Sequence, residues 1–232
     1  MSRAPSKPDQ PKPDLTVVNL IHQSLRADAA RLAAAINELG PGDRRDRLPG
    51  VQAFFGHYRA QLAMHHSHED ELFFPALAAR VGAGLMHLTE LAGQHEALDA
   101  ALHGVGEDVA ALADPAADFA AARVQAASAV SAMAGLLAAH LSLEEQAVLP
   151  LLESDMPAAD YKKLEAKARK ATPRPQARFL IPWIIAHAAA DQRKALFRSA
   201  PPLWLANRLH RRRYRRLDDA LVPAAERPEV AG

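Results

Sequence analysis

Two segments of the chain repeat each other and restrict it to a duplicated helical hairpin. Residues 62–77 (LAMHHSHEDELFFPAL) align with residues 137–152 (LAAHLSLEEQAVLPLL) at an offset of 75. Each copy holds a His-x-x-x-Glu pair, and a proline follows the glutamate six residues later. Upstream, at an offset of 73, His22 aligns with His95. A period of this length indicates duplication of a helix pair, with one histidine on the first helix and His-x-x-x-Glu on the second.

Apolar residues recur at helical spacing on either side of the repeat, and proline or glycine interrupts them. Helices joined by short loops in this way are typical of a bundle. We therefore predict an all-α fold, an up-down-up-down four-helix bundle with a C-terminal helical extension. The four helices are expected from Asp14 or Thr16 to about Leu39, from Pro49 to just before Pro75, from about Leu85 to Leu112, and from near Asp118 to just before Pro150.

Composition divides the chain into four parts. Residues 1–14 contain four prolines and alternate in charge, so we predict a disordered N-terminal tail. We place the bundle at residues 15–155, a basic helical extension at 156–220 and a frayed tail at 221–232. Within the extension we expect a basic helix at 162–170, a linker at 172–175 and a last helix that Pro201 and Pro202 open.

Charge is unevenly distributed along the chain. Residues 1–160 hold 11 Lys and Arg against 21 Asp and Glu, whereas residues 161–232 hold 17 against 6. Such asymmetry indicates either an arm that binds an external polyanion or a basic segment that lies on its own acidic body. We expect residues 176–220 to pack on the bundle, with an anionic membrane surface as the competing partner. The apolar residues expected to anchor this packing are Phe179, Leu180, Trp183, Ile184, Phe197, Leu203, Trp204, Leu205 and Leu209.

Several classes of protein are excluded or disfavoured. The chain has no cysteine, which excludes disulfide frameworks, thiolate metal sites and cysteine nucleophiles. Its first residues lack the apolar core of a secretory signal, so we expect a cytoplasmic protein. Residues 124–143 carry no formal charge, but their many small residues favour a packed bundle helix over a membrane span. No helix-turn-helix or zinc module accompanies the C-terminal arginines, so sequence-specific nucleic-acid binding is not expected.

The repeated histidines and glutamates predict a metal site. Residues four apart lie on one helical face, so each imidazole and its carboxylate point the same way. Two such faces turned inward, together with the two upstream histidines, place four imidazoles and two carboxylates in one core. Burying these groups unpaired is costly, and metal ions remove that cost. Two carboxylates shared by four histidines suit two metal ions, and nitrogen and oxygen ligands without sulfur favour iron, manganese or zinc.

This pattern resembles the hemerythrin-like, HHE cation-binding family over about residues 15–155. The resemblance implies a bundle around a non-haem di-iron centre, in which an oxo or hydroxo bridge of solvent origin joins two iron ions. It assigns His22 and His65 to one iron and His95 and His140 to the other, with Glu69 and Glu144 as bridging carboxylates.

The sequence departs from the oxygen-carrying members of that family at two points. Those members have a second histidine one turn before the third-helix ligand, where this chain has Leu91. Their second bridging carboxylate is an aspartate one residue further on, whereas this chain has Glu144 at the symmetric spacing and Glu145 beside it. A missing imidazole leaves more open coordination, which favours reaction with peroxide or nitric oxide over reversible oxygen carriage.

Other side chains near the predicted ligands have two interpretations each. Tyr58 shares the face of His65 and is a hydrogen-bond donor to the ligands, an unusual ligand or a buried core tyrosine. His68 is close to His65 in helical angle, but its repeat partner is a leucine. His66 lies about 100° around the helix from His65, so we expect it to face solvent. Glu145 is a further candidate for supporting a ligand.

Two classes of function follow. The first is a di-iron protein that binds or reacts with oxygen, peroxide or nitric oxide, with catalase-like decomposition of peroxide as its enzymatic form. The alternative is an iron-responsive regulatory module that contacts a partner through its basic C-terminal extension. Iron storage ranks last, since ferritin-like sites use Glu-x-x-His spacing.

Overall fold

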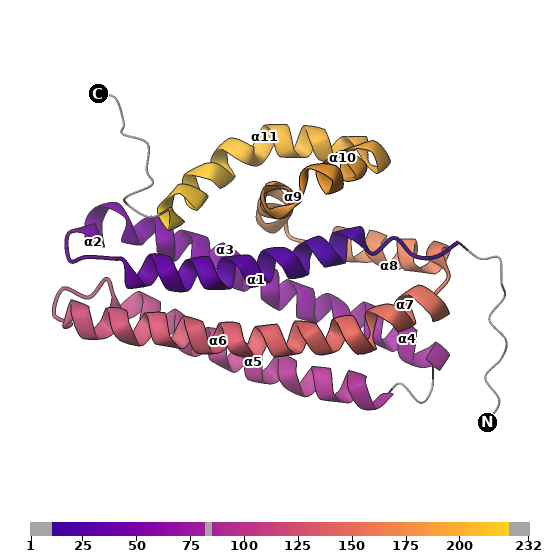
Figure 1. The fold of residues 1–232 in the computed structure, drawn as a ribbon, viewed down its shortest axis with the longest axis horizontal. Coiled ribbons are helices and arrows are strands. Elements are labelled where there is room, and N and C mark those ends of the chain that lie inside the picture. Colours follow the sequence, from indigo (N-terminus) through magenta and orange to yellow (C-terminus); the bar gives the residue numbers. More distant parts are fainter. Residues whose placement is uncertain (1–10, 82–84, 223–232) are drawn as a thin grey trace.

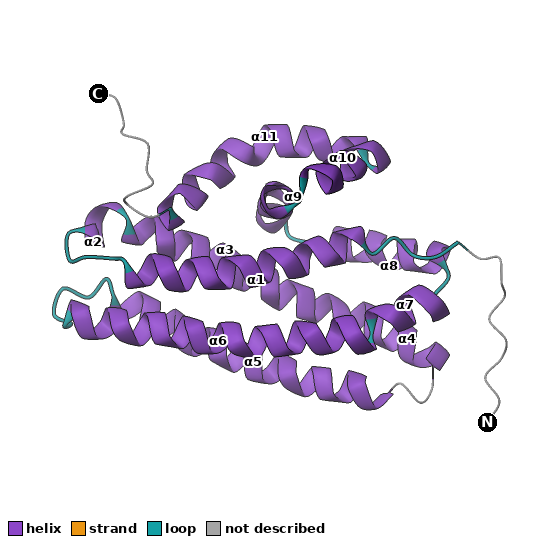
Figure 2. Ribbon diagram, in the orientation of Figure 1, coloured by secondary structure: helices purple, strands orange, loops and turns teal. Residues whose placement is uncertain are grey.

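The structure is a computed structural model that describes residues 11–81 and 85–222. Its long helices lie side by side, and consecutive ones run in opposite directions (Figure 1). Within the described residues there are helices and loops but no strands (Figure 2). The all-α helical bundle predicted from the sequence is therefore confirmed. The long helices are α1 (Thr16–Asn37), α3 (Leu48–His68), α5 (Leu85–Ala111) and α6 (Phe119–Ala147).

Polar side chains fix where two of these helices begin. The amide of Thr16 donates to Asp14 Oδ1 at 3.0 Å, just ahead of α1. The side chain of Asp118 accepts hydrogen bonds from the amides of Ala120 and Ala121 at the start of α6. Each bond satisfies a backbone donor that the first turn of a helix leaves free. The short helix α2 (Asp43–Asp46) follows the Gly40–Gly42 turn, and α7 (Leu149–Asp155) begins with Pro150 in its first turn.

The second predicted helix does not end before Pro75. A π-helical turn, η1 (Glu69–Phe73), follows α3 directly, and α4 (Phe74–Val81) continues through the proline. The amide of Phe74 donates to the carbonyl of Glu69, five residues back. This wider turn relieves the clash of a proline ring with the preceding carbonyl, so the helical path continues beyond the position where a regular helix would stop.

Helix α1 occupies the centre of the molecule. It packs against α6 on one side and against α9 (Arg174–His187) of the extension on the other. One large apolar cluster is shared by the bundle and the extension, and it includes Leu25, Leu62 and Trp183. A second cluster, which includes Phe74 and Leu91, lies at the end where α4, α5 and α7 meet.

The C-terminal extension consists of further helices: α8 (Ala158–Ala171), α9, α10 (Ala190–Ser199), α11 (Pro201–Asp218) and the 3-10 turn η2 (Asp219–Leu221). The predicted linker at 172–175 is too long, because α9 already begins at Arg174. Helix α9 also continues through Pro182, where burial of Phe179, Trp183 and Ile184 on the same helix offsets the lost hydrogen bond. The sequence analysis did not predict α10.

Buried polar side chains fasten the extension to the bundle near the middle of α1 and at the far end of α11. Trp183 Nε1 donates to Asp28 Oδ2 on α1 at 2.6 Å, and His187 Nε2 lies 3.0 Å from the same oxygen. At the far end, the buried Arg47 donates to the carbonyls of Ala220 and Val222. Residues 176–220 therefore pack on the bundle through α9 and the end of α11, with α11 outermost (Figure 1).

Three of the residues expected to anchor the extension do not do so. Trp204, Leu205 and Leu209 are 51%, 51% and 65% exposed. Leu205 and Leu209 lie on the side of α11 opposite Tyr214, the residue that this helix buries, and Trp204 lies about 80° around the helix from Tyr214.

Both chain ends were predicted as tails, and part of each lies outside the described residues. Residues 1–10 and 223–232 are not described. Residues 11–14, which we predicted as disordered, instead lie against the end of the bundle. The carbonyl of Pro11 accepts from the amide of Ala158 at 3.3 Å, and Lys12 Nζ lies 3.3 Å from Glu153.

One helical stretch of the described chain, Phe119–Asp155, is long and apolar enough to cross a bilayer by length and composition. It comprises α6 and α7. Helix α6 packs against α1 and α5 and carries two of the predicted metal ligands into the bundle, as expected for a bundle helix.

Candidate metal centre

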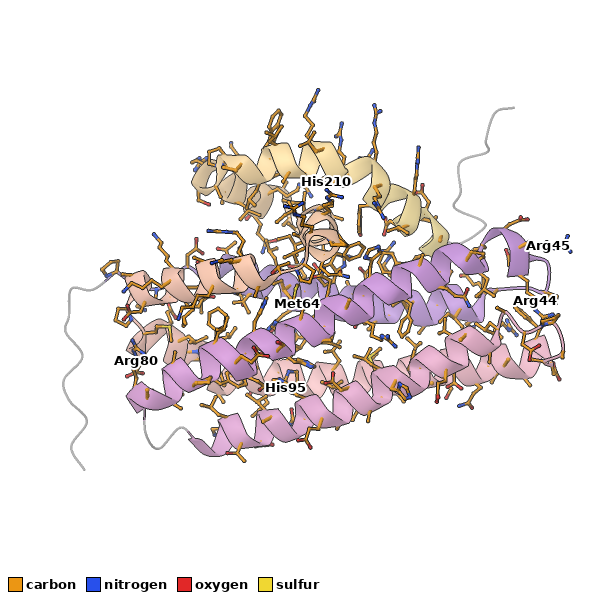
Figure 3. The ribbon with its side chains drawn as sticks, turned by 180° about the vertical axis from the view of Figure 1, so that it is seen from behind. Arg44, Arg45, Met64, Arg80, His95 and His210 are labelled. Carbon is orange, nitrogen blue, oxygen red and sulfur yellow. The ribbon has the colours of Figure 1, made fainter. Side chains whose placement is uncertain are left out.

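Two groups of donor atoms meet inside the bundle. The first comprises His22, His65, Glu69 and Glu144, and the second comprises His66, His95 and His140. Within each group the nearest donor atoms all lie within 4.8 Å of one another, and all seven side chains are buried. They come from α1, α3, η1, α5 and α6. Figure 3 shows the bundle from behind, with His95 labelled among the long helices.

Glu69 lies between the two groups. Its Oε1 is 3.0 Å from His65 Nε2, and its Oε2 is 3.5 Å from His95 Nε2. One carboxylate therefore faces an imidazole of each group, as a bridging ligand must. Glu144 Oε2 lies 3.2 Å from His22 Nε2 and 3.9 Å from His65 Nε2, on the side of the first group. Its role as a second bridge stays a prediction.

Oxygen atoms outside the centre hold three of the imidazoles. His22 Nδ1 lies 3.0 Å from Glu145 Oε1, and His95 Nδ1 lies 3.0 Å from both oxygens of Asp70. His140 Nδ1 is 3.2 Å from Gln94 Oε1. Because a carboxylate or an amide oxygen only accepts, Nδ1 carries the proton in each ring. The Nε2 lone pair of the neutral imidazole then points inward, as in metal-ligating histidines.

The inward atoms are buried and have no partner. Eight buried nitrogen and oxygen atoms of described side chains lack a hydrogen bond, and all belong to the seven residues of the two groups. Leaving such an atom unsatisfied costs roughly 1–3 kcal/mol. Metal ions would satisfy one atom of each residue, seven of the eight, because the imidazole of His66 ligates through one nitrogen only. Imidazole nitrogens with carboxylate oxygens are a donor set that suits iron, manganese or zinc, so these residues fit metal ions.

Comparison with known families gives an independent result. The family model of the hemerythrin HHE cation-binding domain matches residues 15–152, more than half of the chain. The chain belongs to this family. Searches of curated proteins and of solved structures gave no match. The boundaries of the hemerythrin HHE domain enclose every residue of the two donor groups, and the extension from α8 onward lies outside them.

The internal repeat of this hemerythrin HHE domain extends to the groups that support the ligands. Asp70 and Glu145 are 75 residues apart, the same offset as the His-x-x-x-Glu pairs. Each holds a histidine of the other hairpin, His95 and His22 respectively. Glu145 is itself held by Arg26 through bonds of 2.6 and 3.0 Å. The sequence analysis identified Glu145 but missed Asp70, which the offset could have revealed.

His66 contradicts its prediction. We expected it to face solvent, but it is 2% exposed and its ring stacks on that of His95 at a centroid distance of 4.0 Å. Helix α3 contacts α1 and α9 as well as α5, so two adjacent faces of it are covered. The internal repeat could have predicted the burial of His66, because the offset of 75 pairs it with Leu141, an apolar residue that is fully buried.

The position of His66 also bears on the interpretation of Leu91. We predicted that Leu91 leaves one metal ion short of an imidazole. Leu91 is indeed buried in the apolar cluster beside the centre, but His66 brings a third imidazole to the second group. His66 is therefore a candidate for the imidazole that Leu91 does not supply, and open coordination of this ion stays a prediction.

Two further side chains lie away from the donor groups. The hydroxyl of Tyr58 donates to the backbone carbonyl of Leu25 at 3.1 Å, so Tyr58 is a core residue that makes its hydrogen bond within the apolar cluster. His68 lines a surface cavity of about 650 Å³ between α3 and the start of the extension, together with Glu71 and Lys167. Neither donor group found in the described residues includes it.

Burial and neighbouring charges set the protonation of the centre. Burial lowers the pKa of His140 to about 4, and burial beside other imidazoles lowers that of His66 to about 2, so both rings are neutral. For His22 burial acts in the same direction, but the adjacent carboxylates of Glu144 and Glu145 outweigh it and raise the pKa of this ring to about 9. Burial and the nearby charge of Glu144 raise the pKa of Glu69. Without metal, protons supply the positive charge that these carboxylates require.

Proposed function

We propose that this hemerythrin HHE domain holds two iron ions and that the protein binds or reacts with dioxygen, peroxide or nitric oxide. The observation that carries the proposal is the set of eight orphaned donor atoms, which fall into two adjacent groups with Glu69 between them. One ion cannot satisfy donors that belong to two groups. Two ions joined by a carboxylate can.

The chain would hold the ions unequally. His22 and His65 would ligate one ion, and His66, His95 and His140 the other, with Glu69 between them and Glu144 on the first side. When bound, such an iron pair supplies electrons and vacant coordination positions for small oxygen- or nitrogen-containing ligands. With Glu69 shared, each ion would have four protein ligands, two imidazoles and two carboxylates on one side and three imidazoles and one carboxylate on the other, so each would keep positions for a small ligand.

The surrounding residues prepare the centre for this chemistry. Glu145, Asp70 and Gln94 keep three imidazoles in the orientation that directs Nε2 inward. Apolar clusters lie on both sides of the ligands along the helices, with Leu62 and Leu98 in one and Phe74 and Leu91 in the other. Such a shell limits water and admits small neutral molecules more readily than ions.

Metal analysis and spectroscopy test the proposal. Protein loaded anaerobically with ferrous iron should retain close to two irons per chain, and its absorption spectrum should change on adding oxygen, peroxide or nitric oxide. One metal per chain, or zinc retained in competition with iron, would overturn the di-iron assignment. A long-lived oxygen adduct that argon reverses would indicate oxygen binding, whereas loss of added peroxide would indicate a catalase-like reaction.

Substitution of His66 tests the revised ligand set. His66→Leu places in this position the residue found at Leu141, its repeat partner, and should lower iron retention on the side of His95 and His140. His103→Leu is the matched control, because that imidazole is 75% exposed on α5 and should leave two irons bound. Equal iron content in both variants would exclude His66 as a ligand.

An iron-responsive regulatory role is a second candidate, and one observation favours it. His22 of the centre and Asp28, which anchors the extension, lie on the same helix α1. Metal binding that shifts α1 would change how firmly Trp183 and His187 hold the extension. Limited proteolysis of metal-free and iron-loaded protein tests this coupling, and identical cleavage in the extension would exclude it.

A further inference from the structure

The outer face of α11 combines exposed apolar residues with a dense positive charge. Trp204, Leu205 and Leu209 are half exposed or more, although large apolar side chains are normally buried. The same helix carries six exposed arginines, one between Leu205 and Leu209 and five nearer the C-terminal end. They are Arg208, Arg211, Arg212, Arg213, Arg215 and Arg216.

These residues form one continuous surface. At about 100° per residue, the exposed positions of α11 fall within an arc of roughly 200° that runs from Arg211 to Arg213. Tyr214 lies on the opposite side and packs against Phe54 and Phe179. Figure 3 shows long side chains with nitrogen tips that project from α11 away from the bundle.

The positive charge of this surface is not neutralised within the described part of the protein. Asp218 is the only acidic residue of α11, and it pairs with Arg31 of α1 at 2.7 Å. None of the six arginines lies within ion-pair distance of a described carboxylate. The guanidinium of Arg208 instead lies 5.8 Å from the ring centroid of Trp204, which keeps the indole and the charge on the same side.

We propose that the outer face of α11 binds the surface of a bilayer that contains anionic phospholipids. Indole and leucine side chains enter the boundary between headgroups and acyl chains, and arginines bind the phosphates around them. The exposed leucines distinguish this partner from a nucleic acid, whose phosphates would engage the arginines alone. A second copy of the same face is disfavoured because it would bring twelve like charges together.

Binding through this face leaves the other functional parts of the molecule intact. Helix α11 is the outermost layer and packs on α9 and α3, away from α5 and α6 (Figure 1). The extension remains packed on the bundle through Trp183 and Arg47 while its outer side contacts lipid. The metal centre is enclosed by the other helices, so the two sites are separate.

Sedimentation of the full chain with lipid vesicles tests the proposal. We expect binding to vesicles of phosphatidylcholine with phosphatidylserine and none to phosphatidylcholine alone. Trp183 is fully buried and Trp204 half exposed, so a blue shift of tryptophan fluorescence on binding reports on Trp204. Arg212→Gln and Arg216→Gln should each weaken binding roughly fivefold. A Leu205→Ser/Leu209→Ser variant should lose the fluorescence shift and most of the binding.

Matched variants on another face complete the test. Val124 and Leu136 of α6 are 58% and 49% exposed, and a Val124→Ser/Leu136→Ser variant should bind vesicles like the unaltered protein. Unaltered circular dichroism of each variant establishes that it is folded. The proposal is overturned if the protein binds no vesicles or if the two double variants bind vesicles equally well. It is also overturned if the protein prefers RNA to anionic vesicles and the Leu205→Ser/Leu209→Ser variant keeps that preference.

Discussion

Replacement of Trp183 by phenylalanine tests how the extension is held to the bundle. Trp183 is fully buried, and its Nε1 donates at 2.6 Å to the carboxylate of Asp28, which is also fully buried. A hydrogen bond to a charged group contributes about 1.5–3 kcal/mol to stability. Asp28 keeps Arg31 and His187 as partners, so its charge remains paired. The loss is therefore expected near 2 kcal/mol, plus a smaller contribution from the reduced ring volume.

Thermal unfolding measures this loss. For a chain of this size, 1 kcal/mol shifts Tm by roughly 2–4 °C, so Trp183→Phe should lower Tm by roughly 5–10 °C. The measurement compares variants at equal iron content, because bound metal itself raises Tm. Trypsin should also cleave the variant faster at Arg178 and Arg193, which lie on helices α9 and α10 of the extension.

The matched control is Trp204→Phe, the same change at the half-exposed indole of α11. It should alter stability by no more than about 0.5 kcal/mol. A double-mutant cycle of Trp183→Phe with Asp28→Ala, which removes the accepting oxygen, should give a coupling energy of about 1–2 kcal/mol. If Trp183→Phe and Trp204→Phe shift Tm equally, or if the cycle shows no coupling, the hydrogen bond to Asp28 does not hold the extension.

Three further predictions concern the centre and the far anchor of the extension. Glu145→Gln and Asp70→Asn should each weaken iron retention about 10–100-fold, and by similar factors, because the two residues occupy equivalent repeat positions. Iron content after dialysis against a chelator measures this loss. If only one of the two variants loses iron, the two positions are not equivalent. His140→Ala should lose iron and lower Tm in iron-replete preparations, and an unchanged iron content would remove His140 from the ligand set. Gly50→Ala should destabilise the protein by about 1–3 kcal/mol, since a Cβ there would lie 2.7 Å from the Cβ of Ala220. Gly56→Ala has open space around it and should stabilise the protein by roughly 0.5–1 kcal/mol. Denaturant unfolding compares the two variants, and equal effects would refute the close contact.

Sequence reasoning located the long helices because proline, glycine and capping residues act locally. Asp118 accepts from two amides at the start of α6, and Pro150 stands in the first turn of α7, close to the predicted boundaries. The reasoning failed where tertiary packing outweighs a local rule. Pro75 follows a π-helical turn, so it does not end the helix.

The residues of the metal centre could be predicted wherever the two copies of the internal repeat were compared position by position. His-x-x-x-Glu is visible as a motif, so its residues were found. Asp70 was missed because only the histidines and glutamates of the motif were compared, and His66 was missed because it was judged by helical angle alone. Glu145, the repeat partner of Asp70, indicates that this position contacts a ligand. Leu141, the repeat partner of His66, indicates that this position faces the core. Exposure of Trp204 could not be predicted, since composition does not tell which side of an amphipathic helix is covered.

The central position of α1 also sets the order in which the chain can fold. Its main neighbours are α6 and α9, whereas its contact with α3, the next long helix in sequence, is smaller. During synthesis from the N-terminus, α1 therefore emerges long before the helices that bury it. Contacts between segments this far apart in sequence slow folding, because the intervening chain must be ordered first. A nascent chain that stops before Trp183 leaves the carboxylate of Asp28 without its indole partner, so we expect the last long-range steps of folding to be the docking of α9 and then of η2 onto α1.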